Sequence, residues 1–283
     1  MKKTVGIIGY GYVGKSMGRL FPDAKIYDKF QPEYNSSRHK EDVNKCDLAI
    51  VCVPTPMKKN FSCDTSIVED VVNWLETPLI LIKSTVPPGT TLLLRTKMNK
   101  SVCFSPEYVG EGGYFIPEWL YPHPVKVETH TFLIVGGDKK DTSEIVDIFQ
   151  EKLGPTKKYI QTDSTTAELT KYMENIWGAT KVTFSNEFYS IAEAFGVDYN
   201  ELRELFLLDS RTEPMHTSVF PNKRGFAGKC YPKDLHALIE AVREKGYTSL
   251  LLQEVVDTNI RLRKEHEPDN KDEYDELFQD KKV

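Results

Sequence analysis

The stretch Gly9-Tyr-Gly11-Tyr-Val-Gly14 decides the fold of this 283-residue chain. It follows an apolar run, Thr4 to Gly9, and opens Tyr12 to Phe21, where apolar residues recur at helical spacing. In such a strand-to-helix turn, the first glycine permits the tight turn, the second lets the backbone approach a pyrophosphate, and the third lets helix and strand pack closely. The start of the helix faces the phosphate charge. The stretch therefore predicts a dinucleotide site; a glycine-rich structural turn is the alternative.

A carboxylate, Asp28, ends the second predicted strand, 19 residues after Gly9. A carboxylate at this point binds the ribose 2′-hydroxyl and repels a 2′-phosphate. We therefore predict NAD as the cofactor, while the neighbouring Lys29 keeps NADP as the alternative.

The first 160 residues alternate short apolar runs with helical patterns, which predicts an α/β fold with a Rossmann-like, doubly wound parallel sheet. The strands we expect are Thr4–Gly9, Lys25–Tyr27, Leu48–Val53, Leu79–Lys83, Val102–Ser105 and Thr131–Val135. The helices we expect are Tyr12–Phe21, Ser66–Leu75, Thr90–Met98 and Thr142–Leu153.

The second half is helical and is built on one long helix. We expect helices at Asp163–Phe195, Tyr199–Leu207, Pro232–Lys245 and Ser249–Arg263. The long helix has more apolar residues than one small domain needs, which favours a homodimer interface over a fully intrachain core. We thus expect a Rossmann-like domain at 1–160, a central helical domain for dimerisation and catalysis at 161–263, and a charged tail at 264–283.

Composition excludes several classes of protein. The net charge is −5 and there is no basic stripe, so no nucleic-acid partner is expected. No apolar run approaches the roughly 20 residues that cross a membrane, and the N-terminus does not resemble a signal peptide. The five cysteines include no Cys-x-x-Cys pair, so we expect neither disulfides nor a metal site, and a cytoplasmic location.

A cysteine stands where a helix is predicted to start, in Gly225-Phe-Ala-Gly-Lys-Cys230-Tyr-Pro-Lys-Asp234. The start of a helix and a nearby lysine both lower the pKa of a thiol. The glycines let the preceding loop bend and a substrate approach. We therefore predict that Cys230 is a nucleophile rather than a small buried apolar residue.

Other polar residues carry a weaker signal. Val53-Pro-Thr-Pro56 and Lys83-Ser-Thr-Val-Pro-Pro-Gly-Thr90 follow neighbouring predicted strands, at the edge where ligands of open α/β sheets bind. Lys171 and Asn175 are four residues apart on the long helix and project from one face. Glu107 and Glu111 follow another strand end. Taken one at a time, stiffened loops and solvated polar residues explain these positions equally well.

Together these segments closely resemble the UDP-glucose/GDP-mannose dehydrogenase family. The matching runs occur in family order from residue 4 to about 263, and include Ser105-Pro-Glu-Tyr, Ala167-Glu-Leu-Thr-Lys171, Asn186-Glu187 and Asp209-Ser-Arg211. The resemblance implies an NAD-dependent enzyme of polysaccharide biosynthesis that oxidises a nucleotide-sugar 6-hydroxyl twice, through a thiohemiacetal and a thioester on Cys230. UDP-glucose is the substrate that we expect.

The resemblance also implies the role of each site residue. Lys171 and Asn175 stabilise oxyanion charge, and Glu111 is the base for the hydrolytic water, with Thr85 and Asp234 positioning it. Glu107 supports the same loop and, with Lys171, Asn175, Arg211, Gly225 and Phe226, binds the substrate; Arg211 reaches a neighbouring subunit. The cofactor-binding residues are Gly9, Gly11, Tyr12, Val13, Gly14, Asp28, Pro54, Thr55, Ser84, Thr85 and Lys233.

Three departures from the family pattern stand out. Ala227 replaces a glycine, the segment between Asp28 and Asp47 is short, and no Gly-Leu-Ala-Phe-Lys-Pro type motif occurs, so we expect the family's C-terminal domain to be missing. Three outcomes are then open. The chain binds its substrate without the C-terminal domain, a partner supplies that domain, or the chain does not act on nucleotide sugars. A single-step β-hydroxyacid-type dehydrogenase and an NAD-binding protein without turnover remain as alternative functions.

Overall fold

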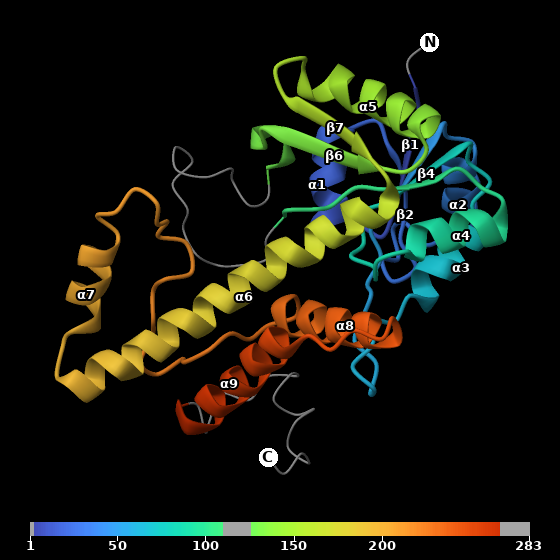
Figure 1. The fold of residues 1–283 in the computed structure, drawn as a ribbon. Coiled ribbons are helices and arrows are strands. Elements are labelled where there is room, and N and C mark those ends of the chain that lie inside the picture. Colours follow the sequence, from blue (N-terminus) through green and yellow to red (C-terminus); the bar gives the residue numbers. More distant parts are fainter. Residues whose placement is uncertain (1–2, 110–125, 267–283) are drawn as a thin grey trace. The chain divides into compact units, whose positions relative to one another are not determined.

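The structure is a computed structural model that describes residues 3–109 and 126–266 (Figure 1). The chain divides into two compact units. The first comprises Met1–Pro56 and Asp64–Lys171, and the second comprises Met57–Cys63 and Tyr172–Val283. A short segment that follows the third strand thus belongs to the helical unit, although it lies early in the sequence.

The first unit is a seven-stranded sheet with the strand order β2-β1-β3-β4-β5-β6-β7. All neighbouring strands are parallel except β5 and β6, which are antiparallel. The strands are β1 (Val5–Ile8), β2 (Lys25–Tyr27), β3 (Leu48–Val51), β4 (Leu79–Ile82), β5 (Val102–Phe104), β6 (Phe132–Gly136) and β7 (Lys158–Thr162).

Helices cover both faces of this sheet, as the doubly wound prediction requires. Their bounds are α1 (Tyr12–Leu20), α2 (Ser37–Asn44), α3 (Ser66–Trp74), α4 (Thr90–Met98) and α5 (Lys139–Leu153), with a short 3-10 turn at Val127–Thr129. Apolar residues of α1 and α5 form one buried cluster with the strands, and those of α2, α3 and α4 form another. Successive strand residues alternate between the clusters, so Ile7 joins the first and Ile8 the second.

The prediction of a Rossmann-like α/β fold followed by a long helix is confirmed, with corrections in detail. The sheet is not wholly parallel, because β6 and β7 run opposite to the other strands. Helix α2 and strand β7 were not predicted, and α5 begins three residues earlier than expected. Helix α2 buries only Val43, and β7 has no buried residue, so neither carries an apolar pattern that sequence can reveal.

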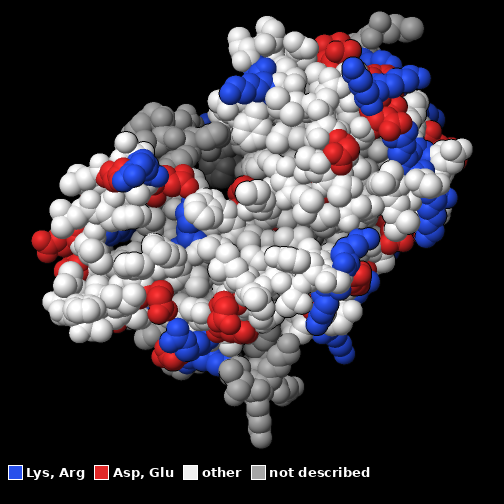
Figure 2. Space-filling model, in the orientation of Figure 1, with Lys and Arg blue, Asp and Glu red and all other residues white. Residues whose placement is uncertain are grey.

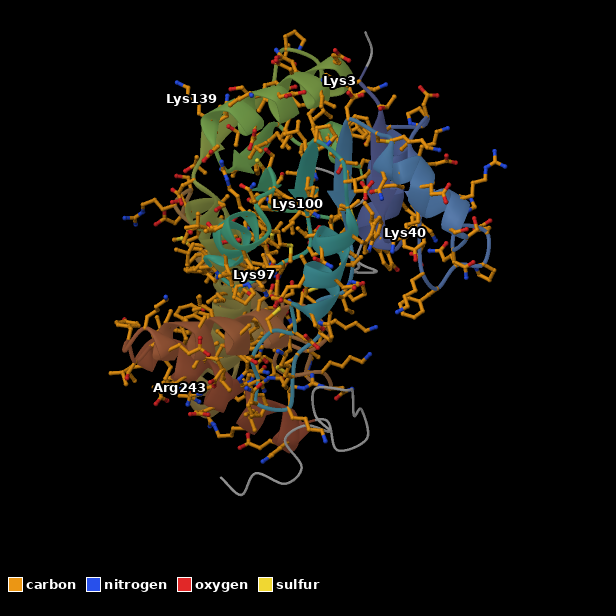
Figure 3. All side chains as sticks on the ribbon, turned by 90° about the vertical axis from the view of Figure 1, so that its right-hand side faces the viewer. Lys3, Lys40, Lys97, Lys100, Lys139 and Arg243 are labelled. Carbon is orange, nitrogen blue, oxygen red and sulfur yellow. The ribbon has the colours of Figure 1, made fainter. Side chains whose placement is uncertain are left out.

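Lysine side chains make contacts at the C-terminal end of α3. Lys100, labelled in Figure 3, donates from Nζ to the carbonyl oxygens of Val72, Asn73 and Leu75 at 2.6–2.8 Å. These carbonyls end α3 and have no partner within the helix. Lys40 is also labelled there, and its Nζ lies 4.2 Å from the centre of the Trp74 ring. Two lysines therefore lie at the C-terminal end of α3, where positive charge is favourable.

The long helix α6 (Ser164–Phe195) contributes a fully buried carboxylate, Glu168, to the first unit. Glu168 accepts hydrogen bonds from the backbone N–H groups of Gly89 (2.6 Å) and Thr91 (2.8 Å), at the start of α4. Gly89 has a φ of +94° and no side chain with which to cap α4. Glu168 therefore supplies the cap that the local sequence lacks.

We expect stability to depend on pH through Glu168. Burial raises the pKa of this carboxyl to about 7, although the N–H donors of Thr91 and Gly89 oppose the rise. The folded state then binds the proton more tightly than the unfolded state, whose pKa is near 4.5. Relative to Glu168→Gln, the natural protein should lose up to about 1.4 kcal/mol of unfolding free energy per pH unit as pH rises from 4.5 to 7.

Urea unfolding between pH 4.5 and pH 8 measures this difference. The control is Glu193→Gln, because Glu193 lies exposed on the same helix. Parallel stability curves for the natural protein and Glu168→Gln would contradict the prediction.

The second unit contains most of α6 together with α7 (Tyr199–Phe206), α8 (Tyr231–Glu244) and α9 (Leu250–His266). Its core joins Tyr172 and Ile176 of α6 to Leu235 of α8 and Val256 of α9. The inserted segment takes part, because Cys63 belongs to this core and the ring of Phe61 stacks on His236 at 4.8 Å. Helices α8 and α9 lie side by side within this unit (Figure 1).

Candidate functional site

The glycine loop has the geometry of a dinucleotide site. Gly9 has a φ of +85°, and a Cβ there would lie 2.6 Å from the carbonyl oxygen of Cys52. A Cβ at Gly14 would lie 2.0 Å from the carbonyl oxygen of Gly9. A Cβ at Gly11 would meet no atom of the described residues within 4 Å, so the backbone there is open to a ligand. Only glycine is tolerated at Gly9 and Gly14, while Gly11 leaves room for a phosphate.

The start of α1 fits the phosphates of NAD. Its N-cap, Gly11, supplies no side-chain hydrogen bond, and the first turn holds no acidic residue. The N–H groups there can accordingly bind an anion. The loop lies where the strand order reverses between β1 and β3, which is the ligand position in open α/β sheets. Tyr12 and Val13 form the first turn, and Tyr12 is exposed.

Asp28 stands beside this loop, at the end of β2. Its Oδ2 accepts the backbone N–H of Tyr10 at 2.6 Å, and its Oδ1 accepts that of Phe30 at 2.8 Å. Gln31 completes the link, since its Nε2 donates to the carbonyl oxygen of Tyr10 at 2.8 Å. The carboxylate thus lies next to the glycine loop, as a contact with the adenosine ribose would require.

The two proline loops are joined to each other. The hydroxyl of Thr55 donates to the carbonyl oxygen of Thr85 at 2.8 Å, and that of Ser84 donates to the carbonyl oxygen of Val53 at 2.7 Å. The loops follow the adjacent strands β3 and β4. Pro54 lies exposed between these contacts. The structure therefore brings Pro54, Thr55, Ser84 and Thr85 together at one edge of the sheet.

Three charged side chains of the first unit, Lys83, Glu107 and Lys171, lie near one another. Lys83 is buried and donates from Nζ to Ser105 Oγ (3.1 Å) and to the carbonyl oxygen of Pro106 (2.9 Å). Glu107 accepts the N–H of Val109 at 2.7 Å, and its Oε1 lies 4.0 Å from Lys171 Nζ. Burial lowers the pKa of Lys83 to about 8, although the charge of Glu107 opposes this. Glu107 therefore lies near two cations, Lys83 and Lys171.

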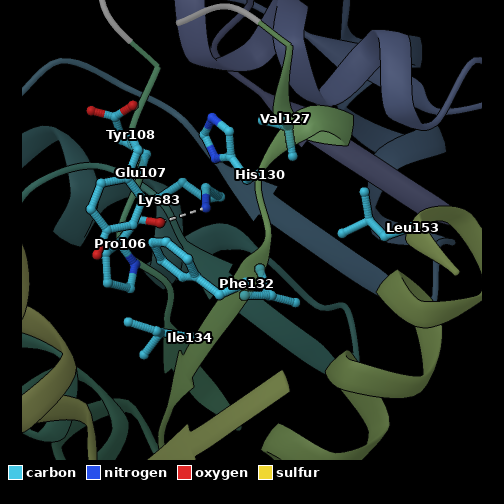
Figure 4. A pocket seen from close by; sticks show the side chains of 10 residues that line it. Lys83, Pro106, Glu107, Tyr108, Val127, His130, Phe132, Ile134 and Leu153 are labelled. Carbon is cyan, nitrogen blue, oxygen red and sulfur yellow. Dashed lines mark hydrogen bonds between the residues drawn. The ribbon is translucent and has the colours of Figure 1, made fainter. Parts of the chain in front are cut away.

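Two of these charged side chains, Lys83 and Glu107, line a pocket (Figure 4). Lys83, Glu107, Tyr108 and His130 form its polar part, and the apolar part includes Phe132. Burial lowers the pKa of His130 to about 4, and the charges of Lys83 and Lys157 add to the effect. The imidazole is therefore neutral at pH 7. Glu111, the second predicted glutamate, lies outside the described residues.

In the second unit, Cys230 is the N-cap of α8 and is exposed. Pro232 follows in the first turn. The carbonyl oxygen of Cys230 accepts the N–H of Asp234 at 2.9 Å, so the thiol belongs to the start of the helix. The other four cysteines are buried or half-buried, and burial raises the pKa of Cys52 and of Cys103 to about 12. Cys230 is thus the most exposed of the five cysteines.

Asp234, which is almost fully buried, links the remaining polar residues of this unit. Its Oδ2 accepts from Asn175 Nδ2 and its Oδ1 accepts from Lys233 Nζ, both at 2.5 Å. Burial alone would lower the pKa of Lys233, but the charge of Asp234 outweighs it and the pKa is raised. Cys63 and Cys230 lie close enough to Lys233 that a thiolate at either position would raise this pKa further. The lysine is therefore a fixed positive charge near Cys230.

The remaining predicted substrate residues differ in their exposure. Arg211 lies on the surface and pairs with Asp209 through contacts of 2.5 and 3.0 Å. The side chain of Phe226 is buried in the core. The N–H of Gly225 donates to Asn186, and that of Phe226 donates to Asn259. The side chain of Arg211 therefore points into solvent within its unit, while the backbone N–H groups of Gly225 and Phe226 are engaged.

Sequence reasoning missed the roles of five residues that support the site. Glu168, Lys83 and Asn186 lay within matched runs and received no role, and Arg224 and Asn259 were not singled out. Asn259 alone gave a usable signal, because it stands among Val255, Val256 and Leu262 on the buried face of α9. A polar residue on an apolar face indicates a hydrogen bond made inside the protein.

Three further observations concern partners. On the face shown in Figure 2, lysine and arginine side chains are interspersed with acidic ones and form no stripe. Across the described ranges, no cluster of three His, Cys, Asp or Glu side chains could hold a metal ion. No helix of the described part is both long and apolar enough to cross a membrane.

A doubly wound sheet with a glycine loop at its switch point, followed by a helical unit on one long helix, defines an NAD-binding protein of the dehydrogenase class. Models of two domains match this chain. They are the NAD-binding domain of the UDP-glucose/GDP-mannose dehydrogenase family at residues 29–151 and its central domain at residues 165–261. The chain belongs to the UDP-glucose/GDP-mannose dehydrogenase family, and NAD is its cofactor, as predicted.

Individual relatives agree with this assignment. The chain is 28% identical over 235 residues to the UDP-glucose 6-dehydrogenase of Rickettsia bellii, covering 79% of this chain and 51% of that protein. It is 29% identical over 231 residues to the GDP-mannose 6-dehydrogenase of Pseudomonas savastanoi pv. phaseolicola, covering 77% and 52%. The chain thus spans about half the length of these curated relatives.

Two solved structures share the fold. A UDP-glucose dehydrogenase from Pyrobaculum islandicum has a TM-score of 0.73 at 22% identity, over 94% of this chain and 71% of that one. A 3-hydroxyisobutyrate dehydrogenase from Mycobacterium tuberculosis has a TM-score of 0.68 at 19% identity, over 94% and 95%. The second structure matches along nearly its whole length.

Proposed function

We propose that this chain is an NAD-dependent nucleotide-sugar 6-dehydrogenase that oxidises a 6-hydroxyl to a carboxylate in two steps, with UDP-glucose as substrate and UDP-glucuronate as product. The observation that carries this proposal is the exposed Cys230 at the start of α8, with the Lys233–Asp234–Asn175 network beside it. A simple alcohol dehydrogenase needs no such thiol, whereas an aldehyde that must be oxidised again does.

The covalent chemistry belongs to Cys230. NAD accepts one hydride in each of the two oxidations. The first oxidation converts the alcohol to an aldehyde and releases a proton. The thiolate of Cys230 attacks the aldehyde carbon to form a thiohemiacetal, the second oxidation leaves a thioester, and water cleaves the C–S bond to release the carboxylate and the thiol. The fixed charge of Lys233 and the start of α8 favour the thiolate.

The other site residues stabilise charge and direct water. Lys171 and Asn175, one helical turn apart on α6, donate to the oxyanion that forms at each addition to the carbonyl. Asp234 holds the amide of Asn175 in place. Glu111 is the proposed base for the hydrolytic water, with Thr85 positioning it, and Glu107 orients Lys171 through their 4.0 Å ion pair. Arg211 is proposed to bind substrate, with its site completed by a second subunit.

We also propose that the chain forms a homodimer. Large apolar side chains of α6 remain exposed, among them Met173 (77%), Trp177 (57%) and Phe184 (53%). Such a surface is typical of an interface between subunits. Sedimentation equilibrium should give about twice the chain mass of 32.4 kDa, and Trp177→Glu together with Phe184→Glu should reduce it to one chain. A monomeric natural protein would contradict this proposal.

The domain boundaries at residues 160 and 263 remain predictions.

The test of the function is an NADH assay with a panel of UDP- and GDP-sugars. Two NADH per sugar, with UDP-glucose the fastest substrate, is the expected result. The match to 3-hydroxyisobutyrate dehydrogenase along its whole length favours one competitor, a single-step oxidation. One NADH per molecule of a 3-hydroxy acid, with no turnover of nucleotide sugars, would establish that competitor. NAD binding without turnover of either class would show a binding protein.

A further inference from the structure

The loop that leads to Cys230 is held from α9 by a single side chain. The N–H of Phe226 donates to Asn259 Oδ1 at 2.7 Å, and Asn259 Nδ2 donates to the carbonyl oxygen of Phe226 at 3.0 Å. Asn259 has no exposed surface. One amide therefore satisfies both backbone groups of Phe226, as a neighbouring strand would, and fixes the position of the peptide four residues before the thiol.

A second amide holds the preceding residues. Asn186 Oδ1 accepts from the N–H of Gly225 at 3.2 Å and from Arg224 Nε at 2.6 Å. Another guanidinium nitrogen of Arg224 donates to the carbonyl oxygen of Asn186 (2.6 Å) and to Ser190 Oγ (2.9 Å). Arg224 is only 1% exposed, and its guanidinium lies 4.4 Å from the centre of the Tyr189 ring. The loop is thus anchored to α6 as well.

The loop conformation and Asn259 fit each other closely. Gly225 has a φ of +76°, a conformation that other residues rarely adopt. A Cβ at Gly225 would lie 2.4 Å from Asn259 Oδ1. The amide thus occupies the space that any other residue at position 225 would need. Asn259 is fully buried on the same face of α9 as Val255 and Val256, where an amide without partners would be costly, so its bonds to the loop explain its presence.

We propose that Asn259 is a positioning residue for Cys230. By fixing Phe226, it restricts the loop to the conformation that presents the thiol at the start of α8, where the helix favours the thiolate. Release of the loop leaves Cys230 in several positions, of which only one is reactive, and misplacement by about 1 Å costs up to about 100-fold in rate. The catalytic part of this proposal rests on the function proposed above.

The test uses the full chain with Asn259→Leu and Asn259→Asp. Leucine removes both hydrogen bonds, while aspartate keeps the volume and the acceptor and loses the donor. The first readout is the rate of alkylation of Cys230 by iodoacetamide from pH 6 to pH 10, without substrate, with Cys230→Ser as the blank. Cys52 and Cys103 do not contribute, because burial raises the pKa of each to about 12. We expect the pH midpoint to rise in both variants and the rate at pH 7 to fall by about threefold or more.

The second readout is turnover. Both variants should lower kcat for the nucleotide sugar by about tenfold or more while NAD affinity stays unchanged, since the glycine loop is not touched. Gln253→Leu is the control, because Gln253 lies exposed on the same helix and should leave both readouts unchanged. If Asn259→Leu does not fold, the Asn259→Asp variant alone tests the positioning role.

Wild-type alkylation and kcat in a folded Asn259→Asp variant, or a loss of stability alone, would overturn the positioning role. The two proposals can fail separately. A chain that oxidises no nucleotide sugar refutes the proposed function, while the alkylation midpoint still reports whether Asn259 sets the reactivity of Cys230.

Discussion

Replacement of Cys230 by serine should lower kcat for the two-step oxidation by roughly 1,000-fold or more, as removal of a catalytic nucleophile does in other enzymes. Serine keeps the shape of the side chain, but its hydroxyl is far less acidic than a thiol and does not trap the aldehyde at neutral pH. Binding of NAD should be unchanged, because the substitution leaves the glycine loop, Asp28 and Lys233 as they are. NADH release per sugar and NAD titration calorimetry measure the two effects.

The matched control for this change is Cys46→Ser. Cys46 is buried near the start of β3, and burial raises the pKa of its thiol, so it has no part in the chemistry. Its variant should keep the natural kcat. If Cys230→Ser still releases two NADH per sugar at more than a tenth of the natural rate, the covalent mechanism is wrong, although the chain could still be a dehydrogenase.

Removal of the Asp234 carboxylate should give the largest loss of stability in the helical unit. Asp234→Ala leaves the largely buried ammonium of Lys233 without its partner and the amide of Asn175 without its acceptor. A buried ion pair broken from one side costs about 3–5 kcal/mol, because the remaining charge stays out of water. Urea unfolding followed by far-UV circular dichroism measures the loss.

A double variant distinguishes the cost of leaving Lys233 without its partner from the cost of lost packing. Lys233→Met combined with Asp234→Leu removes both charges at once and should recover at least half of the lost free energy. The exposed Asp257→Ala on α9 should change the unfolding free energy by less than about 0.5 kcal/mol. A cost below 1 kcal/mol for Asp234→Ala would mean that water reaches the ion pair and that the network does not fix Asn175.

The elements that the sequence predicted well are those with strong local signals. Helix α4 and strand β2 have the predicted bounds, and α6 begins one residue after the predicted start. Helix α5 was placed too late, because its first turn, Lys139 to Asp141, is polar and follows an Asp138 N-cap whose side chain makes no capping hydrogen bond. Polar first turns are normal for helices, but they do not show in the apolar periodicity.

The residues of the candidate site also fall into those that local sequence predicted and those that it did not. The sequence pointed to Cys230 because the helix start, the glycines and the lysine are its neighbours in the chain. It gave no role to Asn259, which acts on Phe226 from 33 residues away, or to Glu168, which caps α4 from 77 residues beyond Thr91. Hydrogen bonds over such separations depend on which elements pack together, and no local pattern encodes that.

The sequence by itself determined the class of the protein. The glycine loop, the alternation of apolar runs with helices, and the order of short motifs each depend on neighbouring residues, so they can be read directly from the chain. Tertiary structure alone decided three things: the reversed direction of β6 and β7, the membership of Met57–Cys63 in the helical unit, and the two asparagines that hold the loop of Cys230. The physical reason is that each depends on contacts between segments far apart in the sequence, which form only when the buried faces of those segments meet.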